Sequence, residues 1–363
     1  MPAAVGQAGV LGTAATTAAG DDTADRAQLH PRIVRGVAGA VYSPAVLRRQ
    51  AHAGASGPGN VSRDVTRILA GGLDTATVLM REATHEGFER QAHTHHRAGV
   101  KPVYLPEERA FIRYIEIPGA DPPLLWLHGW QCSSTGELMP AAVQAQLRGR
   151  RSLVIDFLGH GYSDRPPAFA YTREAHARTI VALIDALSLG ECGLVGHSMG
   201  GAVAVHVATD RPAIVSLLIM AEGALDAGGE EPFDGQSEER FLTHGFHELL
   251  QAQTKEAEAK PEGLRAAHLG ITRMADPVAL HREGLSLQRG TNPSVRSLLA
   301  TLEMRRWYLQ GEASDPAPDL ERDLAAMGVG WKIVPKTGHA MGIQNPEGLA
   351  QAVAEALNES WVD

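Results

Sequence analysis

Residues 192–205 read CGLVGHSMGGAVAV, and they contain a serine in the pattern Gly-x-Ser-x-Gly. The apolar run before the pattern is typical of a buried strand, and the small apolar residues after it are typical of a closely packed helix. Gly196 and Gly200 allow the strand and the helix to approach each other at a sharp turn. Such a turn lifts the hydroxyl of Ser198 above the sheet, so the stretch predicts a nucleophilic serine. An ordinary glycine-rich turn is the alternative interpretation.

On both sides of this stretch, continuous apolar runs alternate with helical patterns. Two strands joined by a polar turn are predicted within 102–119. Apolar strands that alternate with helices are typical of a mainly parallel sheet covered on both faces, so we predict an α/β fold. Further strands are predicted at 123–129, 151–161, 192–197, 214–223, 305–311 and 329–339, and helices near 136–148, 172–187, 199–209, 317–327 and 346–358.

The composition divides the chain into four parts. Residues 1–60 are rich in Ala, Gly, Thr and Ser, and we expect them to be poorly ordered. Apolar residues at roughly helical spacing predict a helical N-terminal extension over 61–101. The α/β core is predicted over 102–223 and 304–363. Residues 224–303 lack the apolar runs typical of buried strands and are predicted to be helical. A helical insertion at the carboxyl end of a parallel sheet is well placed to form a lid over a ligand-binding crevice.

The charge and the cysteine content argue against several classes of partner. A net charge of −9 and the lack of a dense Lys/Arg block argue against nucleic acid, and no apolar run is long enough to span a membrane. Cys132 and Cys192 form no disulfide pattern, so we predict a reduced, cytoplasmic protein. The histidine run at 93–96 lacks accompanying carboxylates or cysteines, and no metal or other cofactor is expected. The expected partner is a small-molecule substrate, and a homodimer stays open.

A serine hydroxyl needs a base to act as a nucleophile, and position must select it among the 16 histidines. His339 directly follows the last predicted strand and precedes the last helix. A loop at the carboxyl end of a strand lies at the same edge of the sheet as Ser198, so His339 is the predicted base. His197 is a poorer candidate, because the residue before a nucleophile on such a turn points away from it.

The segment LHGW at 127–130 ends an earlier strand and predicts an oxyanion hole. In acyl-transfer enzymes of this architecture, the loop after that strand supplies one backbone N–H and the residue after the nucleophile supplies the other. These are the amides of Trp130 and Met199, with Gln131 as the near alternative to Trp130. We expect His128 to order this loop, and we group Gln131, His128 and His197 as residues that contact the substrate.

The segments LHGW, DFLGHGYSD and GHSMGG, with the Gly-His before the last helix, resemble the α/β-hydrolase superfamily in order and spacing. The resemblance covers roughly residues 102–360. It implies an α/β-hydrolase fold with a helical lid and a Ser–acid–His triad, but it says little about the substrate. Asp156 and Asp164, in a loop that many members share, are expected to organise the turn.

The acid of the triad departs from the usual pattern of this superfamily. Most members carry an aspartate as Gly-x-x-Asp after the penultimate strand, whereas this chain has Ser314 in that position. Asp315 comes one residue later and is one candidate. Glu222, which closes the preceding apolar strand, is our first choice because some members carry their acid there. Both candidates stay open.

These residues predict covalent acyl transfer on Ser198, with the acid holding the His339 imidazole in the correct tautomer. The leading hypothesis is a serine hydrolase for a small or medium, largely apolar ester, lactone, thioester or amide. A biosynthetic acyltransferase, a cyclase or a C–C bond hydrolase with the same triad is the alternative, and a non-catalytic ligand-binding protein is a second one. A serine at this position argues against epoxide hydrolases and haloalkane dehalogenases, which need a carboxylate nucleophile.

Overall fold

The computed structural model describes residues 99–228, 232–260 and 263–359. All of them belong to the second of two units, Met1–Thr84 and His85–Asp363. The predictions for residues 1–60, for 61–98 and for the histidine run at 93–96 therefore lie outside the described residues. Among the described residues, no helix is long and apolar enough to cross a membrane. In the same residues, no three His, Cys, Asp or Glu side chains are grouped so that they could hold a metal ion.

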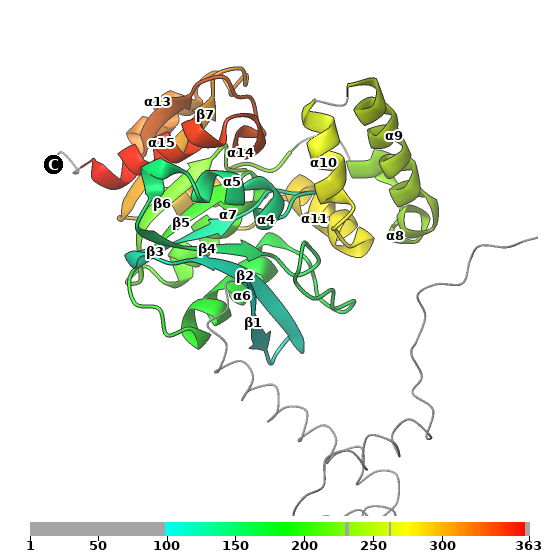
Figure 1. Ribbon diagram of the computed structural model, residues 1–363, viewed down its shortest axis with the longest axis horizontal. Helices are drawn as coiled ribbons and strands as arrows, with labels where there is room; N and C mark the ends of the chain where they lie inside the picture. The colour runs from blue at the N-terminus through cyan, green and yellow to red at the C-terminus, as the bar shows by residue number, and fades with distance from the viewer. Residues whose placement is uncertain (1–98, 229–231, 261–262, 360–363) are drawn as a thin grey trace, which may run out of the picture. The chain divides into compact units, whose positions relative to one another are not determined.

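An eight-stranded sheet forms the centre of the His85–Asp363 unit (Figure 1). The strand order is β1-β2-β4-β3-β5-β6-β7-β8, and β2 runs antiparallel to both of its neighbours. All other neighbouring strands are parallel, which confirms the predicted mainly parallel sheet and gathers the carboxyl ends of six strands at one edge. The strands are β1 (Val100–Leu105), β2 (Ala110–Ile117), β3 (Ala120–Leu127), β4 (Arg150–Asp156), β5 (Cys192–His197), β6 (Val215–Ala221), β7 (Arg305–Gly311) and β8 (Gly330–Val334).

Helices cover both faces of the sheet, because successive residues of a buried strand point to opposite sides. In β3, Leu125 and Leu127 pack into one apolar cluster, while Leu124 and Trp126 pack into another. The first cluster includes residues of α6 (Arg173–Ala186), α7 (Met199–Asp210), α12 (Val295–Leu299) and α13 (Leu320–Ala326), and the second includes residues of α5 (Met139–Ala142), η1 (Ala145–Leu147), α14 (Met341–Gln344) and α15 (Pro346–Asn358).

The single helix predicted near 136–148 is replaced by three short pieces, α4 (Ser134–Glu137), α5 and η1. Proline is the physical reason for the interruption. Pro140 lies in the first turn of α5, and a proline has no N–H to donate back into a preceding helical turn. A new helical piece therefore begins beside Pro140, and α4 with its own Ser133 cap ends before it.

The chain between β6 and β7 is helical in most of its described residues. We call residues 224–303 the helical insertion. It contains η2 (Pro232–Gly235), α8 (Glu238–Arg240), the π-helical η3 (Phe241–Gly245), α9 (Phe246–Ala259), α10 (Leu264–Thr272), α11 (Pro277–Arg289) and α12. Its helices α8 to α11 lie beside the core (Figure 1), whereas α12 packs in the apolar cluster under the sheet.

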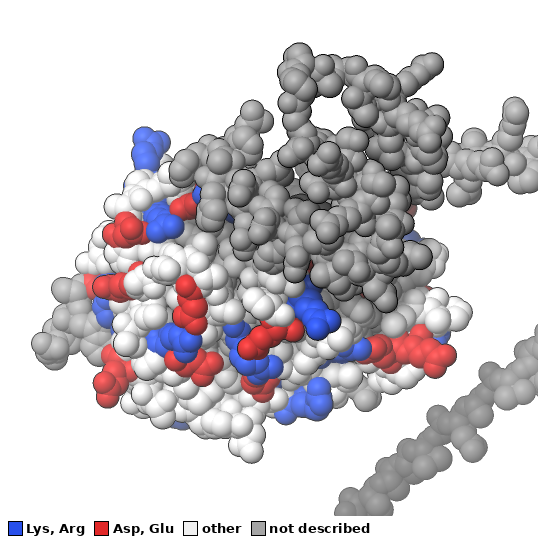
Figure 2. All heavy atoms as spheres, turned by 90° about the horizontal axis from the view of Figure 1, so that it is seen from below, with Lys and Arg blue, Asp and Glu red and all other residues white. Residues whose placement is uncertain are grey.

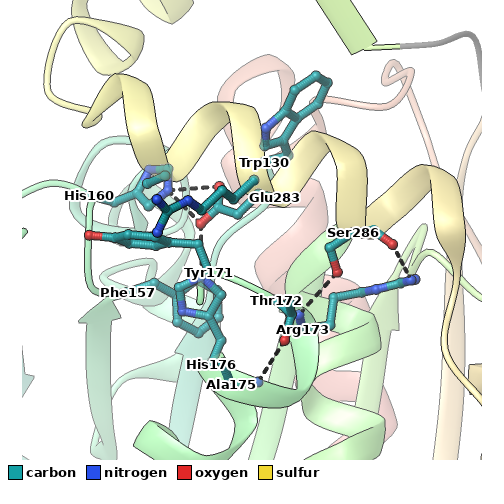
Figure 3. Close-up of polar contacts among 12 residues, drawn as sticks. Trp130, Phe157, His160, Tyr171, Thr172, Arg173, Ala175, His176, Glu283 and Ser286 are labelled. Atoms are coloured by element: carbon teal, nitrogen blue, oxygen red, sulfur yellow. Dashed lines mark hydrogen bonds and ion pairs between the residues drawn. The ribbon is translucent and has the colours of Figure 1, made fainter. Parts of the chain in front are cut away.

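A buried polar cluster fastens α11 to the core (Figure 3). The Glu283 carboxylate of α11 lies 2.9 Å from Nε2 of His160, in the loop after β4, and 2.8 Å from Nε2 of His176 on α6. All three side chains are fully buried. The Arg173 guanidinium adds a hydrogen bond of 2.6 Å to the carbonyl of Ser286. Because buried polar groups are costly to leave without partners, these contacts fix where α11 docks.

We expect Glu283→Ala to lower the free energy of unfolding by about 3 kcal/mol, because two buried imidazoles lose their shared acceptor and a cavity remains. Glu238→Ala is the matched control. It also removes a carboxylate of the insertion, but the Glu238–Arg282 ion pair is partly exposed and contributes at most about 1 kcal/mol. Urea unfolding of the two variants and the wild type measures both effects. Equal losses in the two variants would contradict the assigned role of Glu283.

Charges of both signs are interspersed on the face of the core shown in Figure 2. Glu116 of β2 accepts hydrogen bonds from Arg151 of β4 on one side and from Lys101 of β1 on the other. The described residues of this face therefore alternate in charge instead of forming a patch of one sign.

Candidate active site

Ser198 lies on a strained turn between β5 and α7. Its backbone has φ 50° and ψ −115°, a combination that non-glycine residues rarely adopt. The flanking glycines make the turn possible: a Cβ on Gly196 would lie 2.3 Å from the Gly200 carbonyl oxygen, and one on Gly200 would lie 2.2 Å from that of Leu127. Met199 is the first residue of α7, so its N–H is one of the amides that have no partner inside the helix.

Glu222 and His339 meet at the same edge of the sheet. Glu222 follows β6 with a φ of 45°, and His339 lies in the loop after β8. Nδ1 of His339 lies 2.6 Å from Oε2 of Glu222. Oε1 of Glu222 accepts from the backbone N–H of Gly311 at 2.8 Å and from Nε2 of Gln310 at 3.0 Å. Both carboxylate oxygens are therefore engaged, and the carboxylate is held rigidly at the imidazole.

These contacts define the protonation states of the pair. Burial alone would raise the pKa of Glu222, but its hydrogen bonds with His339, Ser314 and Gly311 outweigh burial and lower that pKa. An ionised carboxylate accepts only, so Nδ1 of His339 carries the proton that this contact needs. The His339 side chain is 59% exposed, whereas that of Glu222 is 8% exposed. The His339 imidazole is thus open to a ligand, and the Glu222 carboxylate is not.

Asp315, the alternative acid, is exposed and lies in the turn after β7. Ser314, in the position where the superfamily usually has its acid, instead forms a hydrogen bond with Glu222. The structure therefore brings Glu222, and not Asp315, to His339.

The loop after β3, residues 128–133, carries the predicted oxyanion residues and contacts the helical insertion. We call it the oxyanion loop. The Trp130 indole donates to the carbonyl of Leu280 in α11 at 2.9 Å. Gln131 has a φ of 61°, its side chain accepts from Nε2 of Gln253 at 3.4 Å, and its carbonyl accepts from the Thr272 hydroxyl at 3.5 Å. The helical insertion and the oxyanion loop thus support each other.

The sequence predicts that His128 and His197 contact the substrate, but the structure buries both rings. Nε2 of His128 accepts from the backbone N–H of Phe157 at 3.1 Å, so its Nδ1 carries a proton and donates to the Gly129 carbonyl at 2.8 Å. Burial lowers the pKa of His128 to about 4, and its ring stays neutral. His128 therefore orders the oxyanion loop and offers no ring nitrogen to a substrate.

Asp156 and Asp164 organise the loop after β4, as the sequence predicts. Asp156 is buried and accepts from the backbone N–H groups of Thr135 and Tyr162 at 3.1 and 3.0 Å. Asp164 accepts from the backbone N–H of Phe111 at 2.8 Å.

Glu137 is a site residue that the sequence reasoning missed. It is fully buried, and its Oε1 lies 2.7 Å from Nδ1 of His197 in an ion pair. Its Oε2 accepts from the backbone N–H of Gly129 at 3.1 Å. Burial alone would raise the pKa of Glu137, but the His197 charge and the Gly129 N–H outweigh burial and lower that pKa to about 2.

The depressed pKa of Glu137 predicts how stability changes with pH. The Glu137 carboxyl has a pKa of about 2 in the folded protein, against an ordinary value of 4.5. It therefore contributes its full stability above pH 4.5, and this contribution is lost as the pH falls toward 2. The full contribution is about 3 kcal/mol. The difference in unfolding free energy between wild type and Glu137→Gln should therefore shrink from pH 6 to pH 2. A constant difference, measured by urea unfolding at each pH, would contradict it.

Comparisons with known proteins agree with this architecture. The family model described as "Alpha/beta hydrolase family" matches residues 124–352. The AB hydrolase superfamily protein YisY of Bacillus subtilis is 26% identical over 271 residues, which are 70% of this chain and 98% of that protein. A thermophilic esterase from Thermogutta terrifontis shares the fold, with a TM-score of 0.59 and 22% identity over 72% of this chain and 98% of the esterase.

One curated relative with higher identity matches over a shorter stretch. An sn-1-specific diacylglycerol lipase of Mus musculus is 38% identical over 101 residues, which are 28% of this chain. In such short matches, the chain spans about a third of the length of the curated relatives.

Proposed function

The chain belongs to the alpha/beta hydrolase family, and we propose that it is a serine hydrolase that works through an acyl-enzyme on Ser198. The observation that carries the proposal is the 2.6 Å contact between Nδ1 of His339 and the buried Glu222 carboxylate, at the edge of the sheet where Ser198 stands on its strained turn. A nucleophile, a base and an acid that orients the base are the parts that acyl transfer requires.

In the proposed reaction, Nε2 of His339 takes the proton of the Ser198 hydroxyl while the Ser198 oxygen attacks the substrate carbonyl carbon. The carbonyl π electrons move to its oxygen, and the N–H groups of Met199 and Trp130 stabilise that oxyanion. His339 then gives the proton to the leaving group as the acyl-enzyme forms. Water attacks the acyl-enzyme in the same way, and the acid product and the free Ser198 hydroxyl are released. Glu222 stays ionised and stabilises the imidazolium in both steps.

The proposed substrate is a small or medium, largely apolar carbonyl compound, and the surroundings of the oxyanion loop support this class. Trp130 packs against an apolar cluster of the helical insertion that contains buried Phe241 and Leu280. The ring of Phe233 lies 5.4 Å from that of Trp130. An apolar wall with a few placed polar groups is typical of a site for such ligands. We propose that the helical insertion acts as the lid of this site.

A panel of matched acyl compounds tests the proposed function. The panel contains p-nitrophenyl esters with acyl chains of increasing length and, for one chain length, the corresponding thioester, lactone and amide. We expect turnover of the short and medium acyl chains by the wild type and none by Ser198→Ala. Failure of the wild type to hydrolyse any class would contradict the proposal.

A further inference from the structure

Three segments of the proposed machinery meet at one buried ion pair, Glu137–His197. His197 is the residue before the nucleophile, and its Nε2 donates to the backbone carbonyl of His339 at 2.7 Å. Its Nδ1 lies 2.7 Å from Oε1 of Glu137, and Oε2 of Glu137 accepts from the backbone N–H of Gly129. The pair therefore touches the loop of the base, the turn of the nucleophile and the oxyanion loop at once.

We propose that Glu137 and His197 are positioning residues, which together set the oxyanion loop and the base loop relative to Ser198. This inference rests on the proposed serine hydrolase function. Neither residue touches the reacting atoms, so both act through the backbone of their neighbours. The N–H of Trp130 belongs to the peptide that follows Gly129, and Gly129 is the residue whose own N–H the Glu137 carboxylate holds.

The chemistry of His197 supports a role for the pair as a unit. Nε2 donates to a carbonyl at 2.7 Å, and Nδ1 lies 2.7 Å from the Glu137 carboxylate. Burial alone would lower the pKa of His197, but the Glu137 carboxylate and the His339 carbonyl outweigh burial and raise that pKa, which favours the imidazolium. A buried imidazolium needs a buried counter-charge, and Glu137 supplies it. Removal of either partner leaves a buried charge on the other without a counter-charge. The contact between the side chain at position 197 and the His339 carbonyl is then weakened as well.

Close packing around the pair leaves the two loops little freedom to move while it is intact. A Cβ on Gly129 would lie 2.8 Å from Nδ1 of His197 and 3.3 Å from the Ser198 Cβ. A Cβ on Gly342, at the start of α14 after the base loop, would lie 2.5 Å from the Glu137 carbonyl oxygen. The rings of His197 and His339 are 4.8 Å apart. The base loop and the oxyanion loop therefore both pack against the two residues of the pair.

The test uses Glu137→Gln, His197→Asn and the double variant, all in the full chain. The double variant buries no uncompensated charge and so keeps the test usable if a single variant folds poorly. Glu116→Gln is the control, because it removes an ion pair on β2 outside the site. The second-order rate of labelling by a fluorophosphonate, and kcat and KM for a p-nitrophenyl ester, are measured per folded molecule, with the folded fraction taken from near-ultraviolet circular dichroism.

We expect each single variant to lose about 10- to 100-fold in labelling rate and in kcat, because displacing reacting groups by about 1 Å costs about 10²-fold. KM should change little. The double variant should lose no more than the worse single variant, since the two residues act as one unit. Glu116→Gln should label at the wild-type rate.

Two outcomes would overturn this inference. Wild-type labelling rates and kcat in folded variants, with only a lower melting temperature, would show a purely structural role. Losses that multiply in the double variant would show that the residues act independently. Failure of the proposed function gives a different result, because the wild type itself would then not be labelled.

Discussion

Ser198→Ala should lower kcat for ester hydrolysis by about 10⁶-fold, the loss typical of removing the nucleophile of a serine triad. In the proposed reaction, the Ser198 hydroxyl oxygen is the atom that becomes acylated. The melting temperature should stay close to that of the wild type, because serine already adopts the φ of 50° and alanine has the same Cβ. Steady-state hydrolysis of the best ester of the panel measures the effect.

Ser188→Ala is the matched control for this variant. Ser188 also has a φ of 50°, but it is exposed and follows α6, away from the carboxyl ends of the strands. It should retain wild-type turnover. A Ser198→Ala protein that keeps more than about a hundredth of the wild-type kcat would rule out an acyl-enzyme at this residue, since the remaining groups supply only part of triad catalysis.

Glu222→Gln should lower kcat by about 10⁴-fold, as expected when the acid of a triad becomes an amide. A glutamine can turn its N–H₂ toward Nδ1 of His339, which selects the tautomer whose Nε2 already carries a proton. It also cannot stabilise the imidazolium that forms during attack. KM should change much less than kcat, because Glu222 is buried behind the base.

Asp315→Asn is the control for Glu222→Gln, because it makes the same chemical change at the other candidate acid. Asp315 is exposed, and the variant should lie within about twofold of the wild type. The opposite ranking, with Asp315→Asn inactive and Glu222→Gln active, would mean that the turn after β7 rearranges to present Asp315 to the base.

Most of the fold could be predicted because its signals are local. The strands of a parallel sheet are continuous apolar runs, and Gly-x-Ser-x-Gly requires a strand before it and a helix after it. The positions of Ser198 and His339 at the edge of the sheet were predictable for the same reason, since each follows a strand directly or by a few residues. The prediction of a single helix near 136–148 was wrong. A proline is tolerated in the first turn of a helix but interrupts its interior, and the sequence did not show that Pro140 lies in the first turn of α5.

The sequence favoured Glu222 over Asp315 as the candidate acid but left both open, since the choice depends on the path of two neighbouring turns. Glu222 reaches His339 because its backbone has φ 45° and the Gly311 N–H anchors its second oxygen. No short-range pattern encodes this geometry.

The buried carboxylates were missed for a related reason. Glu137 reads as an ordinary polar residue of a helix, and its partner His197 is 60 positions away. Glu283 meets His160 across 123 positions. Pairs that form only through long-range packing leave no periodic pattern in the sequence. Glutamate is also rarely fully buried, so burial of these two residues would not be expected from their type.

The most direct test of the proposed serine hydrolase is the intact mass of the protein after incubation with a fluorophosphonate. The wild type should gain one phosphonyl group on Ser198, located by peptide mapping, and should lose its esterase activity in parallel. Ser198→Ala should gain none under the same conditions. An unmodified wild type, or a label on any residue other than Ser198, would contradict the account.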